Sequence, residues 1–171
     1  MDVFEVIKAR RSIRKYRNQR IPDDALDRIL ESARFAPSAG SRYPWFLVVV
    51  RKDETKKALA IACNNVNYIS ECDVFIAAAG DPSQQWYVTD TSVAIEHMVL
   101  TAWEMGIGSC WVGNYNEDLI KTLLSIPQDK RLVACLTLGY ANESPSPRPR
   151  KDMSDLVYRE KYTPTPSPQN F

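Results

Sequence analysis

Short apolar runs alternate along the chain with stretches whose apolar residues recur every three or four positions. The apolar runs, at residues 45–50, 74–79, 109–112 and 131–138, predict buried strands. The stretches between them predict amphipathic helices. The longest of these covers residues 86–105, carries a broad apolar face and is followed by Gly106, a residue typical of helix ends.

Polar residues at the expected helix starts support this pattern. Asp2, with Glu5 three positions later, predicts a cap on a first helix, and Asn116 predicts a cap on the helix before the last strand. Pro22, followed by two acidic residues, indicates the start of a second helix. Asp53 is expected to cap a short helix between the first two strands.

The order of elements is therefore helix, helix, strand, helix, strand, long helix, strand, helix, strand and tail. This order predicts a three-layer domain of the α+β or α/β class. We expect one domain over residues 1–162, followed by a Pro-rich tail over residues 163–171. The apolar face of the long helix is broader than one small sheet covers, which indicates a dimer interface.

Composition narrows the class of protein. With 171 residues, of which 44% are hydrophobic and 25% charged, the chain matches one soluble globular domain. No apolar run approaches the roughly 20 residues of a membrane span, and the first residues lack the pattern of a secretory signal. The four cysteines form no CxxC pair, so we expect no metal site. We expect their thiols to be reduced and to lie in the core of a cytoplasmic protein, which does not bind membranes.

The charge is balanced over the chain and uneven locally. A net charge of +1 argues against broad binding to nucleic acid. Residues 8–20 nevertheless contain seven Lys or Arg and no acidic residue, which indicates a small anionic ligand. Arg10, Arg11, Ser12 and Arg14 follow the first helix, and their side chains can converge on one phosphate. A solvated charged linker explains the same spacing about equally well.

Other segments add candidate chemistry. Arg148 and Arg150 alternate with prolines; alone they are typical of a soluble tail, but with the first cluster they would bracket a phosphate. The small residues at 37–41 form either an ordinary loop or a close approach to a flat ligand. The glycines of residues 106–114 lack the spacing of a Walker loop or of a Rossmann GxGxxG motif, which argues against a nucleotide site of either kind. Because His97 is the sole histidine and no GxSxG motif occurs, the residues favour chemistry supplied by a cofactor.

Four segments, in the same order over nearly the whole chain, resemble motifs of the FMN-dependent nitroreductase family. Residues 9–16 resemble its RRSxRxF-type opening, and residues 36–45 resemble its APSxxNxQPW loop. Residues 90–113 are similar to its long central helix and following strand, and residues 139–150 to its closing GYxxExPxPxR segment. The resemblance implies an α+β fold: a three-layer α/β/α sandwich with a small mixed central sheet, a long central helix and a C-terminal extension that embraces a partner subunit.

The resemblance also implies a homodimer with FMN at the subunit interface. The positions that match the family's motifs would hold the phosphate and ribityl end through Arg10, Arg11, Ser12, Arg14, Arg148 and Arg150. A loop of the second subunit would approach the flavin through Pro37, Ser38, Ala39, Gly40 and Ser41. The strand end would lie along the ring through Trp111, Val112 and Gly113, and Asn64 would hydrogen-bond the pyrimidine edge.

By this resemblance the chain is expected to reduce a small acceptor, such as a nitroaromatic or a quinone, with NADH or NADPH in a ping-pong reaction. No side chain is assigned as an obligate acid or base. Ser41 and Tyr43 stand where the family commonly has Asn and Gln, so redox tuning or substrate choice can differ. Two alternatives stay open: dehydrogenation or dehalogenation on the same fold, and a non-catalytic module that binds flavin or nucleic acid.

Overall fold

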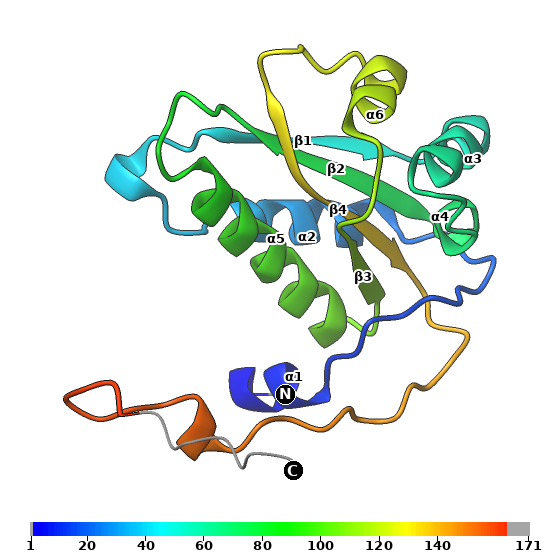
Figure 1. Cartoon of the computed structure of the whole chain (residues 1–171). Helices are drawn as coiled ribbons and strands as arrows, with labels where there is room; N and C mark the ends of the chain where they lie inside the picture. The colour runs from blue at the N-terminus through cyan, green and yellow to red at the C-terminus, as the bar shows by residue number, and fades with distance from the viewer. Residues whose placement is uncertain (1, 164–171) are drawn as a thin grey trace, which may run out of the picture.

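The computed structural model describes residues 2–163, and its centre is a four-stranded sheet in the order β1-β2-β4-β3. The strands are β1 (Trp45–Val50), β2 (Val74–Gly80), β3 (Gly108–Val112) and β4 (Arg131–Gly139). Figure 1 shows the sheet crossing the middle of the molecule. The four expected strands are confirmed, each within one residue of the expected range.

The pairing of these strands differs from the expected mixed sheet. All three pairs of neighbouring strands are antiparallel. The reason is visible at the end of β1, where Val50 pairs with Phe75 at the start of β2, so the helical connection leaves and returns at the same end. Among residues 2–163, parallel pairing is limited to one isolated bridge, between Ser12 and Ser109.

Helices cover both faces of the sheet, which confirms the three-layer α+β architecture (Figure 1). On one face lie α2 (Asp23–Arg34) and α5 (Tyr87–Glu104), and on the other lie α3 (Asp53–Ala62), α4 (Tyr68–Glu71) and α6 (Glu117–Leu124). The strand β2 is buried along its whole length between these layers. Its near-continuous apolar sequence follows from this burial on both faces.

The helix ends follow local capping chemistry, with two differences. The side chains of Asp2 and Asn116 accept hydrogen bonds from the main-chain N–H of Glu5 and Leu119, at 3.0 and 3.1 Å, which confirms both caps. Asp53 is the first residue of α3 rather than its cap, and it pairs with Lys56. The short α4 lies in a region that the polar sequence around Asn67 had indicated as loop.

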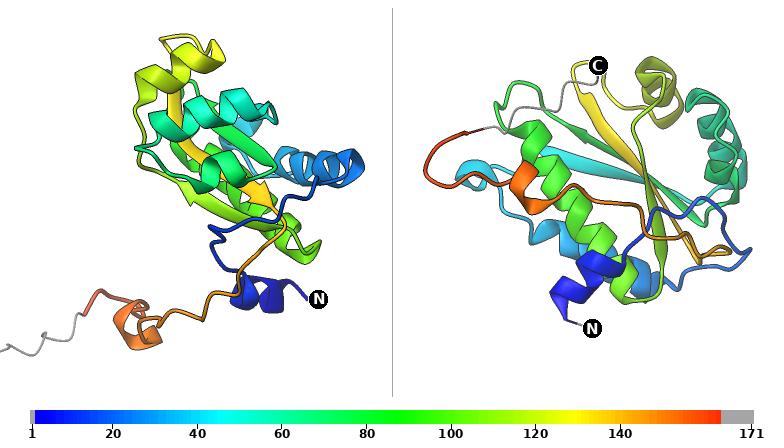
Figure 2. Two further views of the ribbon diagram at one scale, coloured as in Figure 1. Left: turned by 90° about the vertical axis from the view of Figure 1, so that its right-hand side faces the viewer. Right: turned by 60° about the horizontal axis from the view of Figure 1, so that its bottom comes forward.

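Two segments lie outside the three layers. The first is α1 (Val3–Ala9), and the second is residues 142–163, which run away from the sheet as an arm that includes the short turn η2 (Met153–Asp155) (Figure 2). Apart from residue 163, the Pro-rich tail expected at 163–171 lies outside the described residues. Over residues 2–163, no helix combines the length and the apolar character that crossing a membrane requires.

Candidate functional site

The basic segment that follows α1 runs along the edge strand of the sheet. Ser12 bridges Ser109 of β3, and the Ile13 N–H donates to the Ser109 carbonyl at 2.9 Å. Further on, Tyr16 bridges Ala141 just after β4. The segment therefore joins β3 and the end of β4, and it fixes where the cationic side chains leave the main chain.

This close approach requires glycine at two positions of the sheet. A Cβ added to Gly108 would lie 2.7 Å from Cγ1 of Ile13, and one added to Gly139 would lie 2.6 Å from Cδ1 of Tyr16. Real Cβ atoms are not found at such distances from a neighbouring carbon. The two glycines thus leave the space that Ile13 and Tyr16 occupy in the core.

A carboxylate ties the same segment to the start of the arm. The side chain of Glu143 accepts the main-chain N–H groups of Arg14 and Lys15, the second at 3.1 Å. The Asn142 N–H donates to the Lys15 carbonyl at 2.8 Å. Glu143 therefore occupies these two N–H donors, which leaves neither of them to hold an anion.

The three arginines of the cluster differ in their contacts. Arg11 donates to the carbonyls of Lys8, Ala9 and Arg10 at 2.8, 3.0 and 2.8 Å, and so closes the end of α1. The Arg10 guanidinium lies 3.6 Å from Glu96 of α5. Arg14 is exposed. Of the three arginines, Arg14 is therefore the most open to solvent, while Arg10 is partly buried beside Glu96.

A phenol lies under Arg14. Burial, together with the nearby Cys110 thiol, raises the pKa of Tyr68 to about 12, and the Arg14 guanidinium opposes this shift in part. The Cys110 Sγ lies 3.8 Å from the Tyr68 hydroxyl. The phenol is therefore protonated at neutral pH and can donate a hydrogen bond beside the basic segment.

The end of β3 offers an open surface beside this segment. The Trp111 side chain is exposed and Val112 is buried, while a Cβ on Gly113 would meet no atom within 4 Å. The Asn64 amide donates to Asn114 Oδ1 at 2.8 Å, which places Asn64 at the same strand end. Trp111 and one face of α5 line a hollow of about 700 Å³, and Glu96 is part of its wall.

The loop at residues 37–41 lies apart from this surface, at the other end of α5 from α1 (Figure 1). It contains a short 3₁₀ turn, Ala39–Ser41. The Ser38 hydroxyl and the Ala39 N–H both donate to Asp90 of α5, at 2.6 and 3.1 Å. Within residues 2–163 no hydrogen bond or ion pair joins the loop to the basic segment.

Arg148 and Arg150 lie on the arm. Both are exposed, and the one hydrogen bond between them joins an Arg150 Nη1 to the Arg148 carbonyl at 3.5 Å. In the described part of the chain, no hydrogen bond or ion pair links them to Arg10 or Arg14. The chain thus brings the basic segment and Asn64 to the same strand, β3, and leaves the loop and the arm apart.

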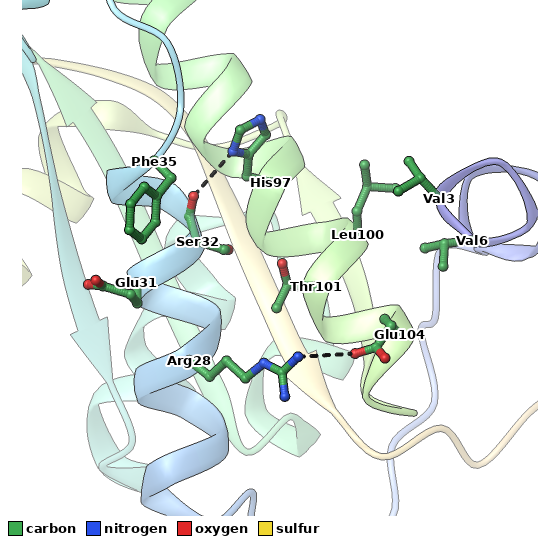
Figure 3. A pocket seen from close by; sticks show the side chains of 10 residues that line it. All are labelled: Val3, Val6, Arg28, Glu31, Ser32, Phe35, His97, Leu100, Thr101 and Glu104. Carbon is green, nitrogen blue, oxygen red and sulfur yellow. Dashed lines mark hydrogen bonds and ion pairs between the residues drawn. The ribbon is translucent and has the colours of Figure 1, made fainter. Parts of the chain in front are cut away.

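A second hollow, of about 520 Å³, lies between α1, α2 and α5. Figure 3 shows Val3, Val6 and Leu100 at one side of it and Phe35 at the other. Nδ1 of His97 lies 3.2 Å from the Ser32 carbonyl, so the imidazole bonds α2 to α5. This contact gives the sole histidine of the chain a structural role.

Two residues with a clear role in shaping these segments were not singled out from sequence. Asp90 and Glu143 each accept two main-chain or hydroxyl donors from a loop that is distant along the chain. Both occur inside the motifs that carry the family resemblance. The signal that could have identified them is an acidic residue that lies inside such a motif and has no basic residue close to it in the sequence.

Comparison of the sequence with known proteins gives one consistent family. The model described as "Nitroreductase family" matches residues 7–70 and 67–140. A relative from Methanothermobacter thermautotrophicus, whose name includes NAD(P)H nitroreductase, is 35% identical over 170 residues. The match covers 95% of this chain and 88% of the relative.

Solved structures agree with this result. A nitroreductase family protein from Clostridium novyi has a TM-score of 0.80 and 34% identity, over 96% of this chain and 97% of that one. An FMN-dependent nitroreductase from Clostridium difficile has a TM-score of 0.79 and 26% identity, over 94% of this chain and 98% of that one. The matches cover nearly the full length of each structure.

Proposed function

Since this chain belongs to the nitroreductase family, we propose that it is an FMN-dependent oxidoreductase that uses NADH or NADPH to reduce small acceptors such as nitroaromatics or quinones. The observation that carries this proposal is the junction of the basic segment with β3. Ser12 bridges Ser109, so the cationic side chains begin beside the strand that ends in an exposed Trp111 and an open Gly113.

The residues at this junction fit FMN in charge and in shape. The guanidinium groups of Arg10 and Arg14 match phosphate oxygens. A Cβ added to Gly113 would meet no atom within 4 Å, so a flat ring could approach the main chain there. Arg148 and Arg150 of the arm would join the phosphate end. Ser12 would keep the segment against β3, and Arg11 would hold its start at the end of α1.

Bound FMN would supply two-electron chemistry, with NADH or NADPH as the hydride donor and the acceptor as the final oxidant. The chain's own residues bind and orient the participants. Arg10 and Arg14 would offset the negative charge of the bound cofactor. In the expected ping-pong order, the nucleotide and then the acceptor would bind in turn at the open surface beside Trp111.

The site is completed, in this proposal, by a second copy of the chain. Exposed apolar side chains lie on α1 and on the arm, including Phe4 at 65% and Leu156 at 58% exposure. The hollow between α1, α2 and α5 gives such side chains an apolar surface on which to pack (Figure 3). A homodimer would also bring the loop at 37–41 of one subunit to the β3 end of the other.

The compartment we propose is the cytoplasm. All four cysteines are free and buried. Thiols that remain unpaired in this way are typical of reducing compartments.

Purification of the full chain, followed by a visible spectrum and titration with FMN, tests the cofactor. We expect a yellow protein, or a colourless one that regains FMN, and rapid anaerobic bleaching by NADH or NADPH with return of colour on adding a quinone or nitroaromatic. A protein that cannot be loaded with FMN contradicts the proposal. Loaded protein that neither nucleotide bleaches would favour the other flavin reactions.

Arginine variants test the phosphate site. Arg10→Ala and Arg148→Ala should each weaken FMN affinity about tenfold, the effect of losing one charge-assisted contact. Arg20→Ala is the matched control, since Arg20 belongs to the same basic stretch but pairs with Asp23 at 3.2 Å. Unchanged affinity in both test variants would mean that the phosphate is held elsewhere.

A further inference from the structure

The main chain of the loop between α2 and β1 adopts a conformation that is unfavourable without support from other residues. Gly40, Ser41 and Tyr43 have φ angles of 61°, 50° and 47°. This left-handed region is disfavoured for residues that carry a Cβ, as Ser41 and Tyr43 do. Contacts with another part of the molecule must therefore stabilise the loop.

Asp90 supplies these contacts from the first turn of α5. Its Oδ2 accepts the Ser38 hydroxyl at 2.6 Å and the Ala39 N–H at 3.1 Å. The Ser38 hydroxyl oxygen in turn accepts the Tyr43 N–H at 2.8 Å. One carboxylate oxygen thus holds both ends of the left-handed stretch. It binds Ala39 directly, and it holds Tyr43 through the Ser38 hydroxyl.

The burial of Asp90 shows that the loop and the carboxylate depend on each other. The residue is 5% exposed, and among residues 2–163 no Lys, Arg or His forms an ion pair with it. A buried carboxylate without a cation needs hydrogen-bond donors, and here both come from the loop. The amino end of α5 adds a favourable dipole.

We propose that Asp90 is a positioning residue, which fixes residues 37–43 in the shape that the flavin site of a dimer needs. The part that concerns flavin rests on the proposed function. Asp90 acts through Ser38 and Ala39, and it need not touch the ligand. The Ser38 hydroxyl connects the carboxylate to Tyr43, so the two side chains form one unit.

Amide hydrogen exchange of the full chain without FMN tests the structural step. Peptides that cover residues 37–44 should exchange about tenfold faster or more in Asp90→Ala than in the wild type. The Ala39 amide loses its acceptor, and the Ser38 hydroxyl that accepts the Tyr43 amide is no longer held by a carboxylate. Asp90→Asn keeps one acceptor oxygen and should restore most of the protection. Glu104→Gln, a charge-removing change at the other end of α5, is the control and should leave the peptides unchanged.

FMN affinity of the same variants tests the functional step. Asp90→Ala and Ser38→Ala should each weaken binding about tenfold, whereas the double variant should bind about as well as the weaker single variant, because both changes break one unit. Additive losses would mean that Asp90 and Ser38 act separately, and would overturn the proposal. Thermal unfolding of each variant shows whether it is folded.

The two readouts separate this proposal from the proposed function. A wild type that binds no FMN would refute the cofactor, while faster exchange in Asp90→Ala would still support the anchoring of the loop. Unchanged exchange in a folded Asp90→Ala protein overturns the anchoring itself. Faster exchange with unchanged FMN affinity overturns the role of the anchored loop in the flavin site.

Discussion

At the scale of single residues, Tyr16 joins the basic segment to the core. Its ring lies against Gly139, and its hydroxyl donates to the Ile13 carbonyl at 2.7 Å. The same hydroxyl lies 2.7 Å from Thr137 Oγ1 of β4. Burial raises the pKa of this phenol far above its ordinary value, so the folded chain holds its proton when the unfolded chain would release it.

This makes stability depend on alkaline pH. A raised pKa in the folded state contributes stability below the unfolded value of about 10, and that contribution declines as pH rises above it. Tyr16→Phe should therefore lower the free energy of unfolding by about 1–2 kcal/mol at neutral pH. It should also flatten the decline between about pH 9 and about pH 11. Urea unfolding at several pH values measures both effects.

Two other tyrosines limit how much Tyr16→Phe can reduce the loss of stability at alkaline pH. Burial raises the pKa of Tyr68 and Tyr115 to about 12, so Tyr16→Phe should reduce the alkaline slope without removing it. Tyr162, whose side chain is 75% exposed, is the matched control, and Phe there should leave the slope as it is. An unchanged slope in Tyr16→Phe would mean that Tyr16 ionises alike in the folded and unfolded chain.

At the scale of elements, the edge of the sheet and the basic segment act as one unit. Ile13 and Tyr16 fill space over β3 and β4 that Gly108 and Gly139 leave free. The Glu143 carboxylate then holds the next two main-chain N–H groups. The position of the cationic side chains therefore depends on sheet residues that are themselves uncharged.

Adding one methyl group at either glycine tests this dependence. Gly108→Ala and Gly139→Ala should each destabilise the fold by about 1–3 kcal/mol, because Ile13 or Tyr16 must move. Both should weaken FMN binding as the basic segment shifts. Gly113→Ala is the control for stability, since its Cβ meets no atom within 4 Å. Chemical unfolding that shows equal stability for all three variants would contradict the close packing of the segment.

At the scale of the whole molecule, the chain has apolar surface that its own three layers do not cover. The arm carries Met153 and Leu156 at 70% and 58% exposure, and α1 carries Val3 and Phe4 at 71% and 65%. Figure 2 shows both segments standing away from the sheet and its helices. Apolar surface of this extent is typical of a contact between subunits.

A charge placed on the arm tests the proposed dimer. Leu156→Asp combined with Val157→Asp should shift the protein from dimer to monomer, because two unpaired carboxylates would be buried at the contact. Sedimentation velocity at micromolar concentration measures the change, and FMN should be lost with the dimer. Leu119→Asp on α6, a side chain that is 49% exposed, is the control and should remain dimeric. A wild type that sediments as a monomer would refute the dimer.

The sequence by itself determined the elements and the layers. The apolar runs, the helical periodicity between them and the caps at Asp2 and Asn116 depend on residues within a few positions of each other, and the structure agrees with them. It also pointed to the basic segment and to the end of β3, and the structure joins that segment to the same strand at Ser109. Their use as a flavin site stays a prediction.

Only the tertiary structure decided which distant residues meet. The antiparallel pairing of the sheet depends on how the connecting helices return, which local patterns do not encode. Glu143 meets Arg14 across 129 positions, and Asp90 meets Ser38 across 52. A carboxylate has the same local sequence signature whether it faces solvent or holds a buried loop. Its role follows from the donors that the folded chain brings to it, and those donors lie far away in sequence.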